Sequence, residues 1–212
     1  IERCSLSEIE ERKLKKIVEG LGMIFLSTPF SKAAADQLYE MSVPAFKIGS
    51  GECNNYPLVE HIAKFGKPII LSTGMNNIAS IKIAVKIFLK EKVPFALLHC
   101  TSLYPTPYEK IRLNSILDLK KEFPYAVVGF SDHSISIWPS LGAVSLGASI
   151  IEKHFTSNKT WPGPDIPLSI DPKELSDLIA GSQAIHYSLS GNKKILPEEK
   201  PTINFAYASV VT

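Results

Sequence analysis

The chain has few cysteines, and its charges nearly cancel. Its 3 cysteines, Cys4, Cys53 and Cys100, are odd in number and widely spaced, which excludes a disulfide framework and a thiolate zinc site. A reduced, cytoplasmic environment is therefore expected. The formal net charge is +2 with interspersed signs, so the sequence offers no basic surface for nucleic acid.

Long apolar runs and glycine-rich nucleotide motifs are also missing. No stretch approaches the roughly 20 apolar residues of a membrane span, and no secretory signal is recognised, so no membrane partner is expected. No Gly-x-Gly-x-x-Gly follows an expected strand, which argues against a dinucleotide-binding fold. At 45% hydrophobic residues, the chain can still bury the core of one domain.

Short apolar segments recur along the chain, each ending in a small, hydroxyl or imidazole side chain. Six of them are predicted to be buried parallel strands: residues 25–28, 46–50, 69–73, 96–100, 126–130 and 148–151. Segments with helical patterns fill the gaps, for example 136–147. Such repeated units predict an α/β fold, either a (β/α) barrel or a doubly wound sheet.

Two helix starts have the spacing of a capping box, in which a side chain and the residue three positions later satisfy each other's backbone N–H groups. Ser7 with Glu10 predicts one such start, and Asp171 with Glu174 predicts another.

Two histidines follow neighbouring expected strands at comparable places. His133 comes after the strand at 126–130, and His154 after the strand at 148–151. Parallel strands joined by one helix lie close together, so the two imidazoles are predicted to form a site for manganese or another divalent metal. Asp132 is expected to orient one of the histidines. His99 also ends a strand, as a third ligand or as a packed neighbour.

A phosphate group needs cationic and hydroxyl donors at the carboxyl ends of the strands. Four residues fit this need: Lys47, Ser50, Ser72 and Ser131. Lys47 is flanked by two apolar residues, which is hard to reconcile with a solvated surface lysine. For the serines an alternative stays open, because serine also caps the helices that follow such strands.

A series of longer motifs occurs in one order along the chain. They are FKIGSGECNN at 46–55, LSTGM at 71–75, LHCTSLYPTP at 98–107, GFSDH at 129–133, and EKHFT at 152–156 followed by PGPD at 162–165. Together they resemble the sialic acid synthase family, and the likeness covers nearly the whole chain. The resemblance implies a TIM-type (β/α)8 barrel followed by an antifreeze-like domain.

The resemblance also implies an incomplete barrel, because the six expected strands correspond to the third to eighth of that fold. Residues 1–191 are then a partial catalytic barrel, and residues 192–212 a linker toward an absent C-terminal domain. Family residues that handle water and phosphate would lie in the missing parts, so this chain alone is expected to be inactive. The full-length protein is expected to be a homodimer.

The activity implied by the resemblance is condensation of phosphoenolpyruvate with an N-acetylated hexosamine to a nine-carbon 2-keto acid, with release of phosphate. His133 and His154 are the implied metal ligands, and they act with Glu52 as the catalytic residues. Glu52, Tyr104 and Asp165 are assigned to the amino sugar. For two of these a purely structural explanation stays open, since Glu52 can be an exposed loop acid and Asp165 can start a turn.

The motifs leave the sugar open. N-acetylmannosamine and its 2,4-diacetamido-6-deoxy relative fit best, and pseudaminic acid synthesis is a further alternative. Another phosphoenolpyruvate-dependent barrel aldolase, making seven- or eight-carbon keto acids, is a competing enzyme reading. An inactive barrel fragment that only pairs with another chain is the competing reading from a different class.

Overall fold

The computed structural model describes residues 6–206. Cys4 and the last six positions of the expected linker lie outside the described residues. Five parallel strands form one sheet in the order β1-β2-β3-β4-β5, so each strand pairs with the next one in the sequence. The strands are β1 (Phe46–Ile48), β2 (Ile69–Ser72), β3 (Phe95–Cys100), β4 (Val127–Asp132) and β5 (Ile151–Lys153).

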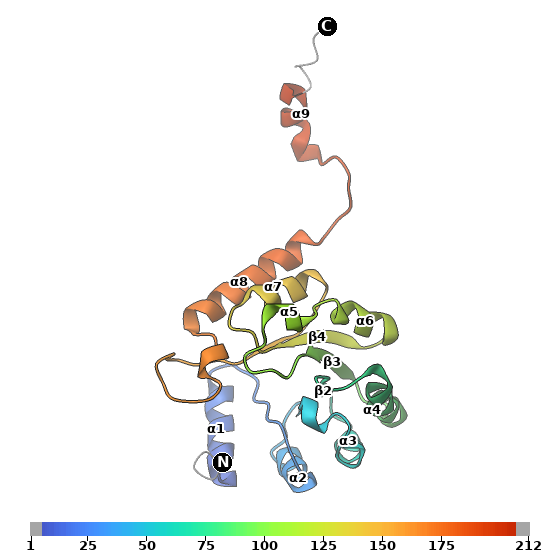
Figure 1. Ribbon diagram of the computed structural model, residues 1–212, viewed down its shortest axis with the longest axis vertical. Coiled ribbons are helices and arrows are strands. Elements are labelled where there is room, and N and C mark those ends of the chain that lie inside the picture. The colour runs from blue at the N-terminus through green and yellow to red at the C-terminus, as the bar shows by residue number, and fades with distance from the viewer. Residues whose placement is uncertain (1–5, 207–212) are drawn as a thin grey trace.

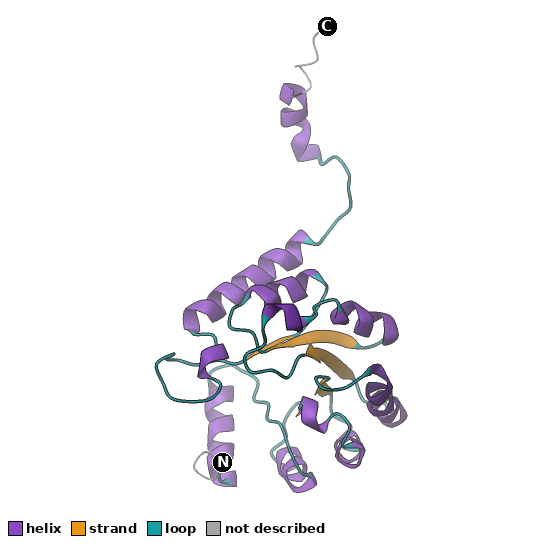
Figure 2. Cartoon of the chain, in the orientation of Figure 1, coloured by secondary structure: helices purple, strands orange, loops and turns teal. Residues whose placement is uncertain are grey.

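Helices follow each strand and cover the outer side of the sheet, which curls into a half-barrel (Figure 1). The helices of residues 6–206 are α1 (Glu8–Gly20), α2 (Lys32–Glu40), α3 (Tyr56–Ala63), α4 (Ile78–Glu91), α5 (Tyr108–Ile111), α6 (Ser115–Glu122), α7 (Trp138–Ser145), α8 (Pro172–Ser188) and α9 (Lys200–Ala206). Short 3-10 turns occur at η2 (Ser50–Glu52), η3 (Ile166–Leu168) and η4 (Pro197–Glu199). Figure 2 shows the helical layer outside the strands, and α9 on a segment that leads away from the sheet.

The core lies between the sheet and this helical layer. Alternate strand residues point to opposite faces, so Phe46, Ile48, Leu71, Leu97 and Phe130 are at most 2% exposed beneath the helices. The intervening residues face the concave side. This alternation separates an apolar outer face from a more polar inner one.

One predicted strand is wrong. Residues 25–28 form no strand in the structure, although Phe25 is buried. The segment lies near the end of β1, where Thr28 would contact a Cβ added at Gly49. It is at the edge of the sheet, beside a strand of three residues that offers few backbone partners. The expected strand at 148–151 is shifted toward the C-terminus, to Ile151–Lys153.

The sheet has two open edges within residues 6–206. Here β1 pairs with β2 alone and β5 with β4 alone, so the described strands form a curled half-barrel and not a closed barrel. Both edge strands are three residues long, and short edge strands limit unwanted pairing with other chains. Among the same residues, no helix has the length and apolar character needed to cross a membrane.

Both predicted capping boxes are confirmed. Asp171 accepts a hydrogen bond from the backbone N of Glu174 at 2.8 Å, and Glu174 accepts one from the backbone N of Asp171 at 2.9 Å. Ser7 and Glu10 make the same exchange at the start of α1. The box of Asp171 and Glu174 satisfies backbone N–H groups at the start of α8.

Replacing Asp171 with alanine removes a partner of a helix-start N–H group. We expect Asp171→Ala to lower the free energy of unfolding by about 1 kcal/mol, measured by urea denaturation. The control is Asp177→Ala on the same helix, which removes a solvent-exposed pair with Lys173 and is expected to cost less than about 0.5 kcal/mol. Equal losses in the two variants would contradict the role of the cap.

Candidate active site

A row of polar side chains crosses the concave side of the half-barrel. Lys47 Nζ on β1 donates to Ser72 Oγ on β2 at 2.9 Å, and it lies 3.3 Å from Glu152 Oε2 on β5. Ser131 Oγ on β4 donates to the other oxygen of Glu152 at 2.7 Å. Two predicted site residues, Lys47 and Ser131, are therefore connected through one carboxylate, and Ser72 joins them through Lys47.

Glu152 was not among the predicted site residues. A signal was present in the sequence, because Glu152 stands two positions before His154 and alternation places both on one face of the strand. Its side chain remains 41% exposed, while that of Lys47 is 12% exposed. The lysine is thus largely removed from water, as its apolar flanks predict.

The two predicted metal ligands come together. The ring centroids of His133 and His154 are 5.3 Å apart, with an interplanar angle of 66°. Tyr104 stacks on His133 at 4.1 Å and meets His154 edge-on at 5.8 Å. Asp165 Oδ2 lies 3.7 Å from Nδ1 of His154. Four residues that the sequence assigned to metal and sugar thus form one cluster.

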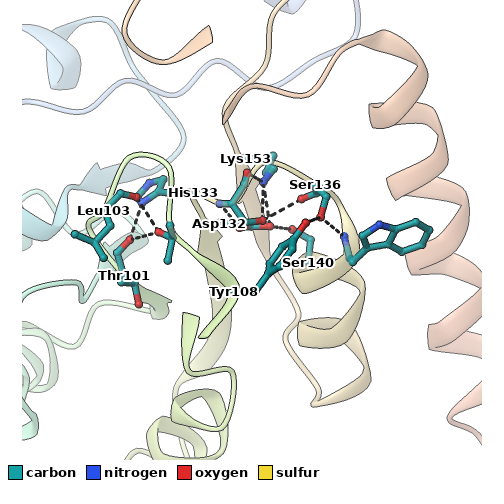
Figure 3. Close-up of polar contacts among 11 residues, drawn as sticks. Thr101, Leu103, Tyr108, Asp132, His133, Ser136, Ser140 and Lys153 are labelled. Atoms are coloured by element: carbon teal, nitrogen blue, oxygen red, sulfur yellow. Dashed lines mark hydrogen bonds and ion pairs between the residues drawn. The ribbon is translucent and has the colours of Figure 1, made fainter. Parts of the chain in front are cut away.

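The backbone decides which nitrogen of His133 can bind a metal. Nδ1 lies 3.0 Å from the carbonyl oxygen of Thr101, and a carbonyl can only accept a hydrogen bond, so Nδ1 carries the proton. Figure 3 shows His133 next to Thr101. The lone pair is then on Nε2.

The two imidazoles differ in proton affinity. Burial acts to lower the pKa of His133, but the contacts with Cys100 and the Thr101 carbonyl outweigh it, and the pKa is raised. Burial lowers the pKa of His154, and Asp165 opposes this only in part. Burial alone would raise the pKa of the Cys100 thiol, but hydrogen bonds with His133, Ser50 and Ser102 bring it below its usual value.

The two imidazoles, with the Asp165 carboxylate next to one of them, are the donors that an open metal site would use here. A structural metal site is closed by four protein ligands. In the described part of the chain, no group of three or more His, Cys, Asp or Glu is arranged to hold an ion by itself. Several coordination positions would therefore belong to water or substrate.

The remaining predicted contacts are less central. Ser50 Oγ accepts a hydrogen bond from the backbone N of Gly74 at 3.0 Å, which ties the loop after β1 to the loop after β2. Glu52 accepts a hydrogen bond from Asn55 within its own loop at 2.6 Å. That contact agrees with the alternative in which Glu52 is an acid of the loop without a role in binding.

Two other expectations need correction. Asp132 does not contact a histidine ring in the described structure, since its carboxylate lies on the outer side of the sheet with Ser140 and Lys153. His99 is also on the outer side, where Nε2 lies 2.7 Å from the carbonyl oxygen of Ile111 and burial lowers the pKa of the ring. His99 is thus a packed neighbour and not a third ligand.

Two hollows adjoin the concave cluster. A cavity of about 240 Å³ is lined by Ser131, Glu152 and the two histidines. A second one, of about 410 Å³, is lined by Lys47, Glu152 and Thr28 together with apolar residues that include Ile70 and Leu98. A larger hollow of about 650 Å³ lies between β5 and α8. Its lining is mostly apolar, and it is on the outer side of the sheet, away from the histidine pair.

A curled parallel sheet with polar groups at the carboxyl ends of its strands is the arrangement typical of (β/α)-barrel enzymes. The NeuB family model matches residues 1–194. The chain belongs to the NeuB family, which confirms the resemblance seen in the sequence.

Named relatives give the family context. The chain is 42% identical over 191 residues to N,N'-diacetyllegionaminic acid synthase of Campylobacter jejuni, covering 88% of this chain and 57% of that protein. It is 37% identical over 194 residues to human N-acetylneuraminate-9-phosphate synthase, covering 91% of this chain and 54% of the relative. The chain thus spans little more than half the length of these two proteins.

A solved structure agrees with this assignment. The N-acetylneuraminic acid (sialic acid) synthetase of Leptospira borgpetersenii serovar Hardjo-bovis, in complex with citrate, superposes with a TM-score of 0.89. It is 35% identical, and the match covers 98% of this chain and 73% of that one. The half-barrel therefore has a counterpart in a larger protein.

Removing the Cys100 thiol should change the titration of His133. Burial lowers the pKa of the ring, and the sulfur contact at 3.8 Å opposes it, so Cys100→Ala is expected to shift the His133 titration to lower pH. NMR of the metal-free chain measures this shift. The control is Cys53→Ala, a buried free thiol beneath α3 whose pKa burial raises to about 12. A His133 titration unchanged by Cys100→Ala would contradict the expectation.

Proposed function

We propose that the protein condenses phosphoenolpyruvate with an N-acetylated hexosamine, giving a nine-carbon 2-keto acid and free phosphate. The observation that carries this proposal is the placement of the His133–His154 pair next to the row containing Lys47, Ser72 and Ser131. A site for an electrophile and a site for an anion then adjoin at one edge of the sheet. Membership of the NeuB family supports the same reaction class.

The anion site follows from charge and donor geometry. Lys47 Nζ is a cation with limited access to water, and Ser72 and Ser131 add hydroxyl donors. These groups would bind the phosphate of phosphoenolpyruvate through charge-assisted hydrogen bonds. In the described structure the carboxylate of Glu152 neutralises Lys47, so the incoming phosphate would have to displace this carboxylate.

The aldehyde site belongs to the imidazole pair. Nε2 of His133 and the ring of His154 would hold Mn²⁺ or another divalent metal. When bound, the metal would supply Lewis-acid polarisation of the sugar's aldehyde oxygen. Tyr104 holds the ring plane of His133 by stacking, and Asp165 presents acceptor oxygens for sugar hydroxyls. Glu52 would join the sugar site through movement of its loop.

The sugar is proposed at the level of a class. N-acetylmannosamine is the first candidate, and the 2,4-diacetamido-6-deoxy sugar of legionaminic acid synthesis is the second. Identity to relatives does not separate these two, because legionaminic acid synthases are 42% and 37% identical to the chain and the human relative is 37% identical. Pseudaminic acid synthesis remains the third.

The wider setting belongs to the same proposal. Residues 192–212 would be a linker to a C-terminal domain, and the complete protein would be a cytoplasmic homodimer. The described half-barrel encloses its polar cluster from one side, and a site open to water loses much of its electrostatic stabilisation. The chain Ile1–Thr212 by itself is therefore proposed to be inactive.

A second candidate function rests on the open edges. A half-barrel with one open edge at β1 and another at β5 could act only as a partner for another chain that completes the sheet. Such a protein would bind neither manganese nor phosphoenolpyruvate. Size measurement together with metal titration separates this candidate from the synthase.

The complete gene product, incubated with phosphoenolpyruvate, Mn²⁺ and a panel of N-acetylated hexosamines, is expected to yield a nine-carbon keto acid detectable by mass spectrometry. His133→Ala should reduce turnover by about 10³-fold or more, because Lewis-acid polarisation supplies several kcal/mol. His186→Ala, an exposed histidine of α8, is the control. No product with any sugar would favour the second candidate.

Lys47→Met is expected to lower kcat/KM for phosphoenolpyruvate by about 10- to 100-fold. A hydrogen bond to a charged group contributes about 1.5–3 kcal/mol, and every 1.4 kcal/mol corresponds to about tenfold. Steady-state kinetics with varied phosphoenolpyruvate measure the change. Lys90→Met, on the exposed side of α4, should leave the kinetics unchanged. An unaffected Lys47→Met would remove the lysine from the anion site.

A further inference from the structure

A buried ion pair lies on the outer side of the sheet, behind the two histidines. Lys153 Nζ on β5 lies 3.1 Å from Asp132 Oδ2 on β4, and the two side chains are 3% and 0% exposed. Asp132 and Lys153 are register partners. Each directly precedes one of the histidines in the sequence. Figure 3 shows the pair beside β4 with His133 on the other side of the strand.

Both residues of the ion pair make further hydrogen bonds. Oδ1 of Asp132 accepts from the backbone N of Ser134 at 2.8 Å, and Oδ2 accepts from Ser140 Oγ of α7 at 2.6 Å. Lys153 Nζ also donates to the carbonyl oxygen of Ser134. The residue that follows His133 is thus held through both its N–H and its carbonyl group.

The backbone of His133 is held on its other side as well. Its carbonyl oxygen accepts a hydrogen bond from the backbone N of Thr106 at 2.8 Å. Between the Thr106 contact and the Asp132–Lys153 pair, the segment that carries the imidazole has little freedom to shift. His154 has a comparable anchor, because Ile170 N donates to its carbonyl oxygen at 2.9 Å.

The position of the pair matters because strand pairing ends there. Asp132 and Lys153 are the last register partners of β4 and β5, and β5 has β4 as its neighbour on one side alone within residues 6–206. One residue before each imidazole, the ion pair links the ends of the two strands through their side chains.

Buried ion pairs add little net stability compared with apolar residues of the same shape, since removing two charges from water is costly. A charged pair at this place therefore calls for a reason other than stability. Fixing the geometry of a site is such a reason, and outer partners of metal ligands commonly do this.

We propose that Asp132 and Lys153 are positioning residues, which set the separation and relative orientation of His133 and His154 without touching metal or substrate. The part of this inference that concerns metal affinity rests on the proposed function. The part that concerns the geometry of the two histidines is independent of it. Removal of both charges should leave the sheet folded and loosen the histidine pair.

The test uses the double variant Asp132→Asn/Lys153→Met, which removes both charges and leaves neither one unpaired in the interior. Mn²⁺ binding to the purified chain is measured by the electron paramagnetic resonance signal of free Mn²⁺. The double variant is expected to bind about 10- to 100-fold more weakly, with thermal unfolding still cooperative. Wild-type affinity in this variant would overturn the inference.

Two controls separate positioning from general destabilisation. Lys173→Met/Asp177→Asn removes an exposed ion pair of α8 and should leave the affinity unchanged. Asp171→Ala lowers stability at a helix cap and should also leave it unchanged. If Asp171→Ala weakens Mn²⁺ binding as much as the double variant does, the effect is one of stability and the positioning role is overturned.

A second measurement holds even if the wild-type chain binds no Mn²⁺, an outcome that would contradict the metal part of the proposed function. Nuclear Overhauser contacts between the rings of His133 and His154, and between Tyr104 and His133, report their spacing without metal. They should weaken in the double variant, while the contact between the stacked rings of Tyr39 and Phe65 at 4.5 Å stays. Unchanged contacts between the histidines would overturn the inference.

Discussion

An ion pair across the concave side brings the first and last described strands of the sheet together. Lys47 on β1 and Glu152 on β5 lie 3.3 Å apart, although three strands separate them in the sheet order. Such a contact requires the sheet to curl, and the curl is what directs the strand ends toward a common centre. The serine hydroxyls and the histidine pair depend on that convergence.

The two faces of the sheet have different tasks. The outer face carries the apolar core and the satisfied pair of Asp132 and Lys153, which make the strand ends rigid. The inner face carries polar groups with contacts that a ligand could replace. A site on a rigid element keeps its geometry more closely than one on a loop, and the position of Glu52 in a short 3-10 turn illustrates the second situation.

The sequence predicted the parallel sheet well because buried strands alternate with helices in a recognisable rhythm. It failed at residues 25–28, since an apolar run looks the same whether or not its backbone finds a partner. The prediction that Asp132 contacts a histidine was wrong because Asp132 and His133 are adjacent in the sequence but their side chains lie on opposite faces of the sheet. In a strand, adjacent residues point to opposite faces, and the same alternation places Glu152 on the face of His154.

Which residues come together at the site was easier to predict than which hydrogen bonds and ion pairs they make. His133 and His154 occupy matched strand ends, so parallel pairing alone brings them together. The partners of a side chain depend on curl, on helix placement and on loops, which a single sequence does not specify. Hence the joining of Lys47 to Glu152, and the hydrogen bond of His133 to Thr101, had to come from the structure.

The strand order has a consequence for how the molecule assembles. Each strand pairs with the next one in the sequence, so each pairing closes only the segment between two successive strands, which limits the loop-closure entropy of that step. The bridge between Lys47 and Glu152 is different, because it needs all five strands in place. A molecule in which the last unit is undocked would have a buried core but would lack the contact between Lys47 and Glu152 on which the convergent polar centre depends.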